Sequence, residues 1–73
     1  SDRSHAEYTE GDTLKGMIEE NLIAERIAIE SYREMVAYLG DEDSTTRRML
    51  EEILASEEEH AEDLSSLLVG MKD

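Results

Sequence analysis

The chain contains no cysteine, proline, tryptophan or phenylalanine among its 73 residues. Without cysteine, no disulfide can supplement the small core of a chain this short, so a bound metal or association with other chains has to do so. The longest apolar run, Met35 to Leu39, is far shorter than the roughly 20 residues that a membrane span requires. No signal-peptide pattern is visible at the N-terminus. We therefore expect no membrane partner and a cytoplasmic location.

Basic residues are also scarce, because seven of them stand against 20 acidic residues and leave a net charge of −13. Such a charge repels phosphate backbones, so we expect no nucleic acid partner and favour metal cations instead. Acidic side chains on exposed helix faces also keep a protein soluble, so charge by itself names no function.

The first eleven residues, 1–11, are polar and show no periodicity, which predicts a flexible N-terminal arm. The remainder, 12–73, is rich in Glu, Ala, Leu, Ile, Met and Arg, which favour helices over strands. Asp12 or Thr13 can cap a first helix that spans about 13–39.

A short connection separates this helix from a second one. Gly40 suits the left-handed conformation just past a helix end, Ser44 can cap a helix over about 45–69, and Gly70 can end it. A connection of about three residues, Asp41 to Asp43, forces the two helices to lie side by side and antiparallel. We therefore predict an all-α fold, an antiparallel two-helix hairpin.

Each predicted helix carries an apolar stripe with spacings of three and four residues. The two stripes comprise Ile18, Leu22, Ile29, Val36 and Leu39, then Leu50, Ile53, Leu64, Leu67 and Met71. Further apolar residues flank both stripes and make the faces broad enough for a bundle core. Because one hairpin leaves part of each face in water, we expect a homo-oligomer, in which a second copy completes a four-helix bundle.

Four polar residues interrupt these stripes, namely Glu25 and Tyr32 in the first helix and Glu57 and His60 in the second. A buried carboxylate without a partner costs several kcal/mol, so such groups pair with one another, stay near water or bind a cation. The neighbouring acids Glu58, Glu59, Glu62 and Asp63 lie off the stripe, and we interpret them as a solvated face.

Position along the axis decides whether the inward groups can meet. Glu25 lies sixteen residues before a turn centred near residue 41 and Glu57 lies sixteen residues after it. His60 follows Glu57 by one helical turn, so all three converge at one level, roughly 20 Å from the turn. Taken singly, a core histidine or a Glu-x-x-His is common, and the shared level is what favours a metal site.

Carboxylate oxygen together with imidazole nitrogen suits iron, manganese or zinc better than magnesium or calcium. Two hairpins related by a two-fold axis bring together two copies each of Glu25, Glu57 and His60. Four carboxylates and two imidazoles form the ligand set of di-iron and di-manganese helical bundles. We therefore predict these three residues as metal ligands. Tyr32 has two interpretations, a hydrogen-bonding or redox side chain near the metal, or a core aromatic residue.

The same residues resemble the last two long helices of a bacterioferritin subunit, within the ferritin-like superfamily. The resemblance spans about Leu14 to Leu68 and rests on Glu25-Arg-Ile-Ala-Ile-Glu-Ser-Tyr32 and on Ile53-Leu-Ala-Ser-Glu57-Glu-Glu-His60-Ala. It implies a ferroxidase centre with Glu25, Glu57 and His60 as ligands and Tyr32 nearby. Rubrerythrins and manganese catalases share parts of the pattern.

The sequence departs from bacterioferritin because the first two helices, which carry the other half of the site, have no counterpart. Encapsulated ferritins are similar in having two main helices per chain and in completing the site by dimerisation. Alternatively, the chain is a piece of a longer ferritin. The haem ligand of bacterioferritins belongs to the missing half, so we expect no haem.

The predicted function is therefore binding and oxidation of ferrous iron at a di-iron site, as a ferroxidase or iron-storage protein. Two alternatives remain at this point. One is a non-enzymatic, acidic oligomerisation module, in which the inward Glu and His residues only set the register of the helices. The other is a manganese or iron protein that removes peroxide.

Overall fold

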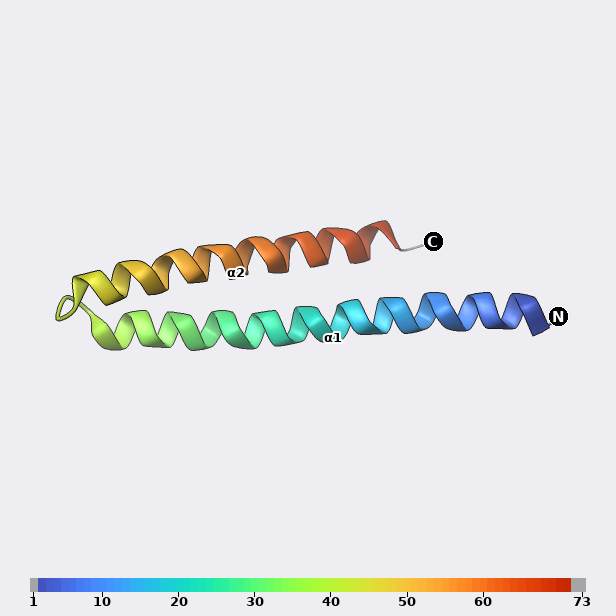
Figure 1. The fold of residues 1–73 in the computed structure, drawn as a ribbon, viewed down its shortest axis with the longest axis horizontal. Helices are drawn as coiled ribbons and strands as arrows, with labels where there is room; N and C mark the ends of the chain where they lie inside the picture. The colour runs from blue at the N-terminus through green and yellow to red at the C-terminus, as the bar shows by residue number, and fades with distance from the viewer. Residues whose placement is uncertain (1, 72–73) are drawn as a thin grey trace.

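A computed structural model of the chain describes the backbone of residues 2–71 and the side chains of residues 11–71. It consists of two helices, α1 (Asp2–Leu39) and α2 (Ser44–Gly70), joined by a short turn. The helices run antiparallel and side by side along a rod of 63 × 16 × 14 Å (Figure 1). No strand occurs within residues 2–71, so the predicted all-α hairpin is confirmed.

The beginning of α1 differs from the prediction. Helix α1 begins at Asp2, so residues 2–11, predicted as a flexible arm, are helical, and Asp12 and Thr13 lie inside the helix rather than at its cap. The physical reason is that the stretch lacks proline, and Gly11 costs only about 1 kcal/mol relative to alanine in a helix interior. A polar composition therefore did not identify a helix boundary here.

The turn follows the prediction. Gly40 has φ +53°, the left-handed conformation that glycine adopts without steric cost, and its N–H donates to the Val36 carbonyl at 3.1 Å. Its own carbonyl accepts a hydrogen bond from the Arg47 guanidinium at 2.9 Å, and the Glu42 N–H donates to the Leu39 carbonyl. The chain reverses direction within four residues, and this reversal sets the register between the helices.

The cap of α2 is Asp43 rather than the predicted Ser44. The Asp43 carboxylate accepts from the Thr46 N–H at 3.0 Å and from the Thr46 hydroxyl at 2.8 Å. These hydrogen bonds lower the pKa of Asp43, because they stabilise its charged form. Helix α2 ends at Gly70, the residue predicted to end it, and the Met71 N–H donates to the Leu68 carbonyl.

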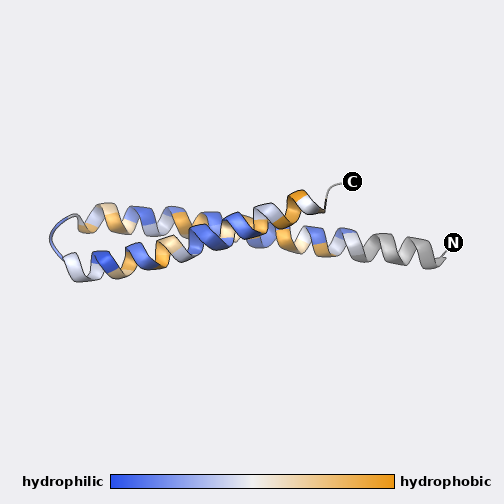
Figure 2. Ribbon diagram, turned by 90° about the horizontal axis from the view of Figure 1, so that it is seen from above, coloured by the Kyte–Doolittle hydropathy of each residue, from blue (hydrophilic) through white to orange (hydrophobic). Residues whose placement is uncertain are grey.

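The interior of the hairpin is small. Within residues 11–71, only Leu22 and Ile29 are buried, with 6% and 7% of their surfaces exposed. Nine large apolar side chains are exposed in the same range, and hydrophobic bands alternate with hydrophilic ones along both helices (Figure 2). One hairpin therefore leaves much of its apolar surface in contact with water. No described helix has the length and apolar character that crossing a membrane demands.

Among the residues with described side chains, 11–71, one ion pair links the two helices. The Arg33 guanidinium donates to Glu58 on α2 at 2.8 Å and to Glu30 on α1 at 2.9 Å. Glu58, predicted to belong to a solvated face, is exposed and also paired across the helix interface. The ion pair between Arg33 and Glu58 therefore connects the two helices next to the buried side chain of Ile29.

Candidate metal centre

Glu25 is positioned by the two residues that are best buried among residues 11–71, Leu22 and Ile29. It follows Leu22 by three residues and precedes Ile29 by four, so all three lie on the side of α1 that packs on α2. Burial of Leu22 and Ile29 against α2 therefore directs the Glu25 side chain toward the facing helix.

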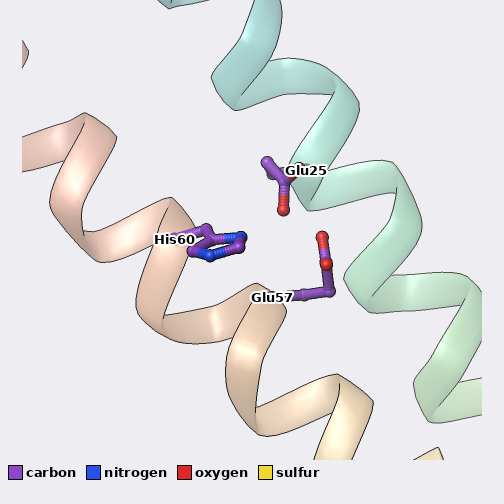
Figure 3. Close-up of side chains that lie close together, drawn as sticks. All are labelled: Glu25, Glu57 and His60. Atoms are coloured by element: carbon purple, nitrogen blue, oxygen red, sulfur yellow. The ribbon is translucent and has the colours of Figure 1, made fainter.

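Helix α2 supplies the other two members of the cluster. Glu57 and His60 are three residues apart, which places them on one face about one turn from each other. One ligand atom from each of Glu25, Glu57 and His60 lies within 4.8 Å of the other two. Figure 3 shows the Glu25 carboxylate pointing from α1 toward α2 and meeting the Glu57 carboxylate and the His60 ring between the helices. We call these three residues the metal triad.

The burial of the metal triad is graded. Glu25 and Glu57 are half-buried, whereas His60 is exposed. The Oε2 atom of Glu25 is shielded from solvent and has no hydrogen-bond partner. A shielded carboxylate oxygen without a partner is costly, and a cation between the triad side chains would remove that cost. The donor set and the orphaned oxygen both fit a divalent metal ion.

The surroundings of Glu25 in the metal triad change its pKa. The pKa of Glu25 is raised, first by a hydrogen bond with Glu57, which requires a proton on one of the two carboxyls. Burial and the negative charge of Glu57 raise it further, and the charge of His60 opposes this effect. The raised pKa shows that a second negative charge is unfavourable at this position, and a bound cation would remove that cost.

A cavity of about 200 Å³ opens beside the metal triad. Its lining includes Glu25 and His60 together with two polar residues that the sequence analysis did not assign to the site, Asn21 and Asp63. Asn21 precedes Glu25 by four residues and Asp63 follows His60 by three, so helical spacing could have identified both. Asp63, predicted as part of a solvated face, is exposed but borders the site.

Tyr32 does not join this cluster. It follows Glu25 by seven residues, so its backbone lies two turns, about 10 Å, closer to the hairpin turn. The side chain is half-buried, and within residues 11–71 its hydroxyl makes no hydrogen bond. The structure therefore places Tyr32 in the same helix interface as Glu25 without a direct link to the metal triad.

Comparison with known proteins gives one match. The model of a family described as Ferritin-like domain matches residues 1–73, which is the whole chain. Searches among curated proteins and among solved structures found no match. The family match includes both helices, the turn and all three residues of the metal triad.

Proposed function

Because this chain belongs to the family of ferritin-like domains, we propose that it binds ferrous iron through Glu25, Glu57 and His60 and oxidises it to ferric iron. The observation that carries the proposal is the approach of three ligand atoms to within 4.8 Å, with one shielded Glu25 oxygen left without a partner. Iron is the substrate in this proposal. Manganese or zinc could occupy the same ligands, because both accept oxygen and nitrogen donors.

The proposal includes pairing of two hairpins at the metal triad. A single hairpin offers three ligand atoms, and its His60 remains exposed although the ring points toward the two carboxylates. Met49 and Leu67 lie eleven residues before and seven residues after His60, so all three share one stripe of α2. Both apolar side chains are more than half exposed. A second hairpin packed on this stripe would bury them and add a second set of ligands.

Charge supports binding of two cations by two hairpins. Such a pair contributes four carboxylates, whose charge balances two divalent ions, and two imidazoles. Two ferrous ions would each lose one electron, and dioxygen would take up both electrons and two protons to give hydrogen peroxide. The role of the chain in this reaction is to hold the ions close together and to neutralise their charge with its carboxylates.

Tyr32 has a supporting role in this proposal and is not one of the metal ligands. Its half-buried phenol lies along the same interface and could donate a hydrogen bond or an electron without contacting the metal. Storage of the ferric product requires a larger assembly than a pair of hairpins. We propose storage as the fate of the iron only for an assembly of that kind.

The test is an oxygen-uptake assay with ferrous iron added to the purified chain. We expect uptake by the unaltered protein and its loss in Glu57→Gln, while Glu59→Gln, which removes the charge of an exposed neighbour, retains uptake. A chain that consumes no oxygen and melts at the same temperature with and without ferrous or zinc ions would instead be an oligomerisation module. Loss of added peroxide with manganese would support the peroxide-removing alternative.

A further inference from the structure

Helix α1 has a second apolar surface that packing against α2 does not explain. Ile23, Ile27 and Tyr38 are 58%, 63% and 89% exposed. At about 100° per residue, Ile27 lies about 200° around the helix from the buried Ile29, on the side facing away from α2. Ile23 precedes Ile27 by one turn and Tyr38 follows it by about three turns, so the three side chains form one stripe.

The outward side of α2 has a different character. Its exposed residues include Arg48, Glu59 and Ser66, which occupy equivalent positions around that helix. The apolar outward stripe is therefore specific to α1. It also lies apart from the α2 stripe of Met49, His60 and Leu67, so pairing at the metal triad would leave it exposed.

Two adjoining hollows follow this stripe. One, of about 410 Å³, is bordered by Ile23, Arg26, Ile27 and Glu34 among others. The next, of about 610 Å³, is bordered by Glu34 and Tyr38 on α1 and extends to Thr46 and Leu50 on α2. Because the two hollows share Ser31 and Glu34, they form one trough that follows α1 and reaches the first turns of α2 at one end. A trough of this length fits another helix better than a small molecule.

The charges beside the trough are self-complementary. Within residues 11–71, Arg33 and Arg47 form ion pairs, whereas Arg26 and Glu34 form none. Arg26 lies four residues before position 30 and Glu34 lies four residues after it. A two-fold axis through position 30 therefore sets Arg26 of each copy against Glu34 of the other, with Ile23 facing Tyr38 to within about one residue.

We propose that this surface, the α1 outer surface (Ile23, Arg26, Ile27, Glu34 and Tyr38), binds the same surface of a second copy of the chain in an antiparallel arrangement. Glu30 lies near the two-fold axis, and its ion pair with Arg33 at 2.9 Å reduces the repulsion between the two copies of Glu30. The α1 outer surface and the metal triad occupy different sides of the hairpin. A chain that uses both surfaces contacts two neighbours, so the assembly contains more than two copies.

The test is a charge exchange measured by sedimentation equilibrium on the full chain in about 0.15 M salt, which screens the overall negative charge. We expect Arg26→Glu and Glu34→Arg each to lower the mass of the assembly at least twofold. The double variant restores the pairing with reversed polarity, and its mass returns to that of the unaltered chain. Arg48→Glu, which changes the net charge as Arg26→Glu does but lies on α2, leaves the mass unchanged.

Circular dichroism of each variant verifies that the helices persist, and the rescue by the double variant separates lost pairing from lost folding. Single variants with unchanged mass, or a double variant that does not recover, would overturn the proposal and assign the trough to a different protein or to a further segment of the chain. Metal binding by Arg26→Glu separates this outcome from the function proposed above. We expect that variant to keep its metal-to-chain ratio, because Arg26 is not part of the metal triad.

Discussion

Glu25 on α1 and Glu57 on α2 bring carboxylate oxygens within 4.8 Å of each other, although 31 residues separate them in the sequence. Two like charges this close repel each other, and the pKa of Glu25 is raised as a result of the hydrogen bond with Glu57, burial and the Glu57 charge. The arrangement favours a shared proton or a bound cation. His60 beside the pair makes a transition metal the fitting cation.

The raised pKa of Glu25 predicts how the stability of the metal-free protein depends on pH. A carboxyl whose pKa is higher in the folded chain stabilises the fold below its unfolded pKa, near 4.5, and this contribution is lost as the pH rises through the folded pKa. Glu25→Gln cannot ionise, so we expect it to be more stable than the unaltered chain at about pH 7, with a smaller difference below about pH 4.5. Urea unfolding in the presence of a chelator measures this. Equal stability at both pH values would contradict the assignment of repulsion to this pair.

Metal binding should turn the destabilising charges of Glu25 and Glu57 into a source of stability. For the unaltered chain, a metal concentration about a hundredfold above Kd adds about 2.7 kcal/mol to the free energy of unfolding. Glu57→Gln and His60→Ala should each weaken binding by at least about tenfold, since each removes a ligand atom. Isothermal titration with zinc ions reports the affinity without oxidation. Glu59→Gln serves as the control, and a loss of affinity in that variant equal to the loss in Glu57→Gln would point to general charge attraction.

Tyr32→Phe tests the supporting position of the phenol. The variant keeps the ring and removes only the hydroxyl, so we expect an unchanged metal-to-chain ratio and iron oxidation slowed by about tenfold. Stopped-flow measurement of ferric iron formation gives the rate. Tyr38→Phe, in which the changed residue is 89% exposed, should oxidise iron at the original rate. An unaltered rate in Tyr32→Phe would leave Tyr32 as a packing residue.

The small core makes a prediction for folding. Leu22→Ala removes one of the two buried apolar side chains, so the free energy of unfolding should fall by about 2–5 kcal/mol. Glu25 follows Leu22 by three residues and should lose its fixed position, so metal affinity should fall as well. Val69→Ala, at an exposed position, should change the stability by no more than about 0.5 kcal/mol. Similar unfolding curves for the two variants would show that Leu22 does not hold the helices together.

The sequence was sufficient to predict the hairpin and the meeting of Glu25, Glu57 and His60. Gly40 marks the reversal, and a turn of so few residues leaves one antiparallel register, so residues equally distant from it must meet. The stripe positions also gave the half-buried placement of Glu25 and Glu57, whereas His60, predicted at a core position, is exposed in the single hairpin because only one neighbouring helix covers it. Both inferences rest on local backbone geometry, which a single sequence encodes well.

Other features of the structure depend on a choice between alternatives that are equally compatible with the residue pattern. Asp43 and Ser44 are both good caps, and the choice of Asp43 follows from its two hydrogen bonds with Thr46. The early start of α1 at Asp2 reflects helix propagation through polar residues that carry no stop signal. The Arg33–Glu58 pair was missed because a long guanidinium side chain reaches across the interface from outside the apolar stripe.

The central claim is best tested by native mass spectrometry of the chain with ferrous iron under anaerobic conditions. The account predicts that iron is retained in assemblies built from pairs of chains, with two iron ions for every two chains, and that His60→Ala loses this iron. Iron held by single 8.3 kDa chains, or retained equally by His60→Ala, would contradict it.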